Sequence, residues 1–136
     1  EIMPSLVGSE MCIRDRAITS TSITNPLTYN ITIDTDCGNT VIADIGPGAI
    51  TIYSIHFNNA ANGAKIWLKG FNALDPTLGT DHPELIIKAY DNQTLDVVFP
   101  AGLYFSTGFS FACVDSAGTA GTTSPTSDVI VRIVTN

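Results

Sequence analysis

The segment 99–111 has the sequence FPAGLYFSTGFSF, and it decides the fold class of this chain. Aromatic residues recur at short intervals around two glycines and one proline, and no apolar spacing typical of a helix accompanies them. Aromatic residues favour strands, whereas Gly and Pro favour turns. The segment therefore predicts two short strands, at 102–106 and 109–114, separated by a tight turn at Thr107-Gly108.

The same two-residue alternation recurs along the rest of the chain. Tyr29, Ile31 and Ile33 alternate with polar neighbours, which predicts a half-buried strand. Residues 49–57 are apolar at both parities, so we expect a central strand that is covered on both faces. Further short strands are expected at 41–45, 65–71, 84–90, 94–99 and 128–135.

These strands, eight or nine at a spacing of roughly ten residues, predict an all-β fold: an antiparallel β-sandwich, jelly-roll-like in its connections. The length of 136 residues fits one domain, which we place at 17–136. Residues 1–16 differ in composition and contain both methionines of the chain. They resemble the translation of a sequencing-library adapter, so we expect an artefact without fold or function, or else a disordered arm. The alternative is a real arm that packs on a neighbouring molecule.

The charge of the chain excludes some classes of partner. The net charge is −7, and charged residues make up only 14% of the sequence, against about 25% in typical soluble domains. An acidic surface repels phosphate groups, so neither nucleic acid nor an anionic membrane is an expected partner. The apolar runs are also far too short to span a bilayer. A low charge content suits pleated strand surfaces, on which Thr packs well, and it also suits proteins that bind copies of themselves. Composition does not separate these two interpretations.

No catalytic residue and no cofactor is predicted. His56 and His82 are the two histidines, and no Gly-x-Ser-x-Gly motif supplies a nucleophile for either. A hydrolase with two carboxylates that meet only in the folded chain is the least favoured reading. Cys37 and Cys113 lack zinc-site spacing, and the sequence does not decide whether they pair.

Asp34, Asp36 and Asn39 form a weak candidate metal site. Their spacing resembles a calcium loop, but Ile45 stands where such a loop carries its bidentate Glu. We therefore expect no metal here, and a turn in which Asp and Asn side chains bond the backbone.

Trp67 is the main candidate for an interface or ligand contact. In the expected strand 65–71, Ile66 and Leu68 face inward, so Trp67 faces outward between Lys65 and Lys69. An exposed Trp anchors protein interfaces and sugar-binding faces. The alternative is that Trp67 packs under a loop or a neighbouring strand, with the lysine stems alongside.

Three blocks of the chain resemble one family. These are residues 66–73, 78–83 and 99–110, followed by an alternating Val/Ile strand at 129–134. The set resembles small β-sandwich structural proteins of tailed, often marine, bacteriophages, over about residues 50–136. The segment Asn72–Asp75 departs from the family pattern.

The resemblance implies a virion component that decorates the head, forms a minor capsid part or associates with the tail. Such a protein assembles with itself and with other virion proteins, and the family transfers no catalytic residue. The competing hypothesis is an extracellular carbohydrate-binding β-sandwich, in which Trp67, Tyr53 and Tyr104 would stack on sugar rings.

Overall fold

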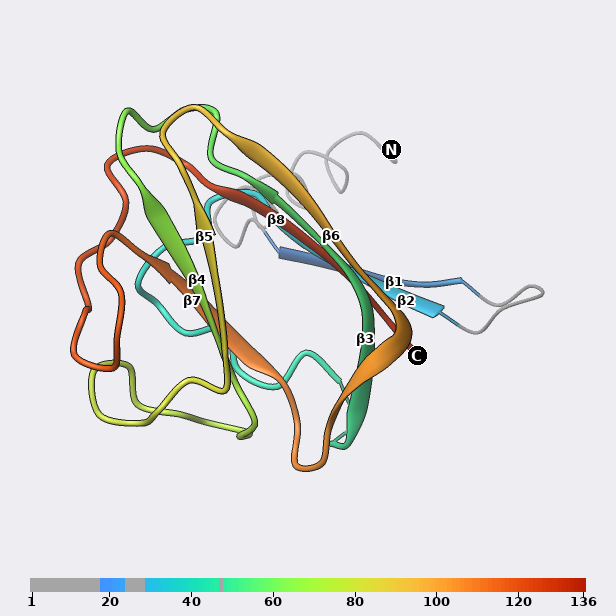
Figure 1. Cartoon of the computed structure of the whole chain (residues 1–136). Helices are drawn as coiled ribbons and strands as arrows, with labels where there is room; N and C mark the ends of the chain where they lie inside the picture. Colours follow the sequence, from blue (N-terminus) through green and yellow to red (C-terminus); the bar gives the residue numbers. More distant parts are fainter. Residues whose placement is uncertain (1–17, 24–28, 47) are drawn as a thin grey trace, which may run out of the picture.

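The computed structural model describes residues 18–23, 29–46 and 48–136, and within them the regular structure consists of strands. The prediction for residues 1–16 lies outside this range. The eight strands are β1 (Ile18–Ile23), β2 (Tyr29–Asp34), β3 (Ile50–Asn58), β4 (Ile66–Phe71), β5 (Leu85–Ala89), β6 (Thr94–Phe105), β7 (Ser110–Val114) and β8 (Ile130–Thr135). They form two antiparallel sheets that pack face to face (Figure 1). The predicted all-β antiparallel sandwich is confirmed.

The connections follow a jelly roll with one added strand. The larger sheet has the order β1-β2-β8-β3-β6, and the smaller has the order β5-β4-β7. Ile42 bridges Phe111 of β7 and stands where a fourth strand of the smaller sheet belongs. When Ile42 is counted as that fourth strand, the chain crosses from one sheet to the other between successive strands from β2 to β8, except between β4 and β5. This is the path of a jelly roll. β1 extends the larger sheet beyond β2.

The core lies between the two sheets and is filled by alternate residues of the inner strands. Its fully buried members include Ile52, Ile55, Phe57, Leu68, Phe109, Phe111, Val131 and Ile133. Each such side chain contributes about 1.5–3 kcal/mol on burial. The register of β3 with β6, and that of β3 with β8, shifts between Ile52 and Ser54.

Three predicted strands differ from the structure. Residues 94–99 and 102–106 form one strand, β6, which accepts Pro100 because it lies at the edge of its sheet. Residues 41–45 contribute only the bridge at Ile42. β1 was not predicted, although its Ile and Thr residues suit a strand that pairs with β2.

The two faces of β2 are the reverse of what its apolar alternation suggests. Thr32 pairs with Ile133, and Asp34 with Val131, and residues directly opposite share one face of a sheet. Thr32 and Asp34 are therefore buried on the core side, while Ile31 and Ile33 face outward and are half-buried. The prediction that β3 is covered on both faces is also wrong: its core side is buried, and its outer side is half-exposed.

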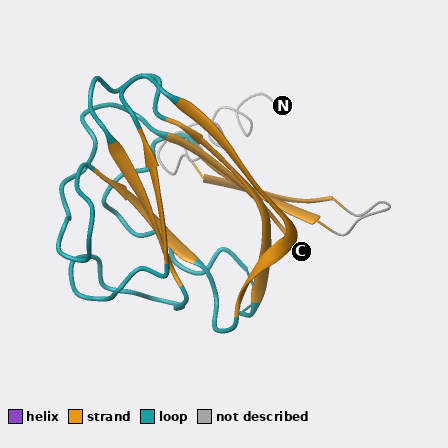
Figure 2. Ribbon diagram, in the orientation of Figure 1, coloured by secondary structure: helices purple, strands orange, loops and turns teal. Residues whose placement is uncertain are grey.

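The outer sides of the two sheets differ sharply. The loops 72–84 and 115–129 gather outside the three-stranded sheet (Figure 2). Under them Ser110, Ala112 and Val114, which face away from the core, are fully buried. On the outer side of the five-stranded sheet Val98 and Tyr104 are each 65% exposed. The outer side of the five-stranded sheet therefore exposes large side chains that the chain itself leaves uncovered.

Candidate functional site

The candidate site is the outer side of the five-stranded sheet, here called the open face. Strand register fixes which side chains share it, since paired residues point to the same side. Its members are Tyr29, Ile31, Ile33, Tyr53, Ser54, His56, Asn58, Thr94, Asp96, Val98, Tyr104, Ile130, Arg132 and Val134. Together they mix aliphatic, aromatic and charged groups, as protein-binding surfaces do.

The centre of the open face consists of three rows that run across β8, β3 and β6. The first row is Val134–Ser54–Val98, the second is Arg132–His56–Asp96, and the third is Ile130–Asn58–Thr94. Each row has one residue from each strand. β3 lies in the middle, so the residues of β8 and β6 flank it on opposite sides.

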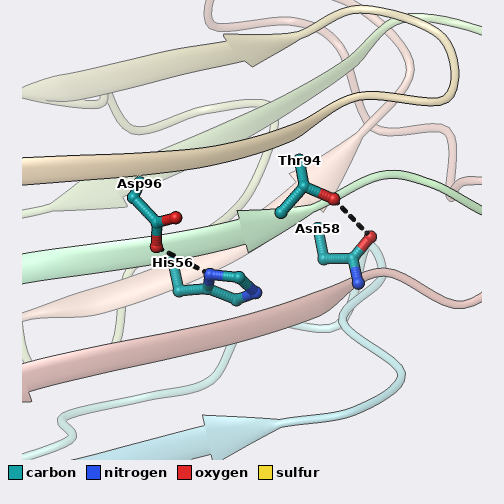
Figure 3. Close-up of polar contacts among 4 residues, drawn as sticks. All are labelled: His56, Asn58, Thr94 and Asp96. Carbon is teal, nitrogen blue, oxygen red and sulfur yellow. Dashed lines mark hydrogen bonds and ion pairs between the residues drawn. The ribbon is translucent and has the colours of Figure 1, made fainter.

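Hydrogen bonds tie β3 to β6 in two of these rows (Figure 3). His56 Nδ1 lies 2.7 Å from Asp96 Oδ1, and the Thr94 hydroxyl donates to Asn58 Oδ1 at 3.1 Å. On the other side of His56, the guanidinium of Arg132 has no ion-pair partner among the described residues. The face therefore carries an exposed cation at one flank and an exposed carboxylate at the other.

Tyrosines occupy one end of the open face. The rings of Tyr29 and Tyr53 meet at 5.0 Å between centroids and 51° between planes. Tyr104 pairs with Thr51 across β3 and β6. Gly102 lies beside Thr51 and Tyr53 with a φ of 78°, and a side chain at this position would collide with Thr51. The glycine thus leaves room for the tyrosine cluster.

The pairing of His56 with Asp96 resembles two members of a catalytic triad, and chemistry of that kind needs a nucleophile as well. Within the described part of the chain, no hydroxyl is hydrogen-bonded to the other ring nitrogen of His56. The same residues contain no group of three or more His, Cys, Asp and Glu side chains placed to hold a metal ion.

The predicted cluster of Lys65, Trp67 and Lys69 lies on the opposite side of the molecule. Trp67 is half-buried, and it pairs with Lys88 of β5 and Val114 of β7. Lys65 is exposed, near the ring of Tyr90. Tyr53 and Tyr104, by contrast, lie on the open face, so the proposed sugar-stacking set is split between two surfaces.

Lys69 lies on the outer side of its strand, as predicted, but it is not exposed there. Its side chain points away from the core but is fully buried, and Nζ donates to the carbonyl of Gly121 at 2.7 Å. Burial lowers the pKa of this ammonium from its usual value. The covering loop, 115–129, has no periodic pattern from which its path over β4 and β7 could have been predicted.

Asp34, Asp36 and Asn39 do not converge on a shared site. Asp34 Oδ1 accepts a hydrogen bond from the backbone N–H of Asp36, which is the expected turn. The amide of Asn39 donates instead to the carbonyl of Thr122. The pKa of Asp34 is raised to about 6, chiefly by burial; the carboxylate of Asp36 adds to the increase, and the backbone hydrogen bond from Asp36 opposes it.

Cys37 and Cys113 are free thiols buried in the core. The backbone N–H of Cys113 bonds the carbonyl of Gly38, so the two segments lie side by side. Burial, with Cys113 adjacent, raises the pKa of the Cys37 thiol well above its usual value. Both thiols therefore act as small hydrophobic core residues.

The described residues contain no helix long and apolar enough to cross a membrane. Comparison with known family models and with curated proteins finds no match for this chain.

Proposed function

We propose that this chain is a structural protein of a tailed-phage virion, which acts without catalysis by binding copies of itself and other virion proteins through the open face. The observation that carries the proposal is the contrast between the two outer sides. The chain covers one with its own loops, while the other exposes Val98, Tyr104 and Arg132, whose guanidinium has no ion-pair partner in the part of the chain that the structure describes.

The fold and the charge agree with this proposal. Jelly rolls occur in viral capsid proteins and in lectins, so the fold is compatible with a virion protein and with a carbohydrate-binding module and does not decide between them. The resemblance of residues 50–136 to phage structural proteins favours the first of these. A net charge of −7 disfavours nucleic acid as the bound partner within the particle.

The test is the mass of the native protein in solution. Sedimentation and light scattering should give a multiple of the 14.4 kDa chain mass, and V98D should reduce it to a single chain. I86D is the matched control, because Ile86 is an exposed aliphatic residue on the other sheet. A wild-type monomer at millimolar concentration would contradict the proposal, as would equal effects of both variants.

A carbohydrate-binding module is the second candidate. The observation that favours it is the gathering of Tyr29, Tyr53 and Tyr104 at one end of the open face, since aromatic rings stack on sugar rings. Binding to immobilised glycans that is lost in Y53A and Y104A, while W67A keeps it, would support this candidate. A wild-type protein that binds no glycan would remove it.

A further inference from the structure

We propose that two copies of this chain pack open face against open face, about a two-fold axis that runs along β3. The inference rests on the proposed function and adds to it the partner, a second copy, and the register of the contact. It follows from the order of residues in the three central rows.

The argument begins with the symmetry of a face-to-face pair. A two-fold axis parallel to β3 exchanges the two flanks, so that β8 of one copy lies over β6 of the other. Residues of one row then meet residues of the same row. Aligned sheets packed in this way lie about 10 Å apart, a distance that opposing side chains fill.

Under this operation each row matches itself. Arg132 of one copy meets Asp96 of the other, and the symmetry repeats that contact, so the interface has two ion pairs. Val134 meets Val98, an aliphatic contact, and Ile130 meets Thr94, which offers a methyl group. The unpaired guanidinium thus gains a carboxylate, and exposed aliphatic surface is covered.

The alternative axis gives the opposite result. A two-fold axis in the same plane but perpendicular to the strands would set each strand against its own copy. Arg132 would then face Arg132, and Asp96 would face Asp96, and the repulsion between like charges in contact opposes association. The distribution of charge therefore selects the axis along β3.

The rest of the molecule supports a second copy as the occupant. The chain is strongly acidic, and the described residues hold ten carboxylates against four cations. Of those cations Lys69 is buried, and Lys65 and Lys88 lie near Tyr90 on the other sheet. Arg132 is the exposed cation on the open face, and Asp96 is the carboxylate placed to meet it.

The test is a charge exchange in the full chain. R132D and D96R should each raise the dimer dissociation constant at least 100-fold, because each sets like charges together at both symmetric contacts. The double variant D96R/R132D restores opposite charges and should return the constant to within about tenfold of wild type. K65D and D91R make the same charge changes away from the face and should leave it unchanged.

Sedimentation equilibrium measures the constants, and thermal melting shows that each variant is folded. If a charge reversal prevents folding, R132Q and D96N remove the same charges without reversing them. Each should raise the dimer dissociation constant about tenfold. Rescue by the double variant supports the geometry. Single reversals that leave the constant unchanged, a double variant that fails to recover, or an assembly with an odd number of copies would overturn it.

Failure of this geometry is distinguishable from failure of the proposed function. An oligomer that is insensitive to R132D and D96R but sensitive to V98D contradicts only the two-fold axis along β3. A wild-type chain that stays monomeric contradicts self-assembly itself, and with it this inference.

Discussion

Inward-facing and outward-facing residues alternate along the strands of both sheets, but the outer side of one sheet is covered by loops and the outer side of the other is exposed. Outside the three-stranded sheet, loops bury Lys69 and the outward residues of β7, and Trp67 is half-buried there. Outside the five-stranded sheet, Arg132, Val98 and Tyr104 stay exposed. The comparison teaches that alternation identifies an outer face, whereas the long connections decide whether the chain covers that face itself.

The largest expected effect comes from reversing one cation on each face. K69D places a carboxylate in a buried site beside the carbonyl of Gly121, so we expect it to cost more than about 3 kcal/mol of folding free energy. R132D changes an exposed residue and should stay within about 0.5 kcal/mol. Urea denaturation at concentrations too low for assembly measures both. Similar losses in the two variants would break the comparison.

The next effect comes from removing one aromatic ring from each face. W67A should cost about 2–3 kcal/mol, because the indole fills space beside Val114 and the stem of Lys88, and it should leave the assembled mass unchanged. Y104A should leave stability within about 0.5 kcal/mol and weaken assembly. Denaturation followed by circular dichroism, together with sedimentation, separates the two. A W67A chain that is fully stable but dissociated would reverse the assignment of the faces.

The smallest expected effect is on the pH dependence of stability, and it concerns Asp34, a polar residue of β2 that faces the core. The pKa of Asp34 is about 6 in the folded chain against 3.8 for the free side chain, so the folded state holds its proton more tightly. The stability that this group contributes is therefore fully present below about pH 3.8 and falls as the pH rises to about 6, by at most about 3 kcal/mol.

D34N keeps the oxygen that accepts from Asp36 and cannot ionise. At pH 7 it should gain on the order of 1–2 kcal/mol, and at pH 4 it should equal wild type. Thermal melting at the two pH values measures the difference. A variant that loses stability equally at both would show that the carboxylate is needed for another contact.

The fold class follows from the sequence because alternation of period two is a local property. The alternation of period two in residues 99–111 and in the Val/Ile pattern of β8 is clear enough to exclude helices there. The predictions that fail are those in which contacts between residues far apart in the sequence determine which face of a strand is buried. Alternation shows that Ile31 and Ile33 share a face, but only the pairing with β8 shows that this face looks outward.

The site was harder to predict for the same reason. The sequence suggests Tyr53 and Tyr104 as residues that would stack on sugar rings, but nothing in it places Tyr29 beside Tyr53. His56 and Asp96 are 40 residues apart and meet only through the register of β3 with β6. Lys69 was assigned to the outer side correctly, and the loop that buries it passes over β4 from a segment some 50 residues later.

The margins of the two sheets have a consequence for how this protein aggregates. Along the free side of β7, the backbone groups of Phe109, Phe111 and Cys113 are already bonded to Ile45, Ile42 and Gly38. In β6, Pro100 interrupts the row of amide donors. Neither margin presents the unbroken template on which strands of other molecules add to build fibrils. Addition of strands from other molecules is thereby disfavoured at these two edges, so that any fibril growth would have to proceed from β1 or β5.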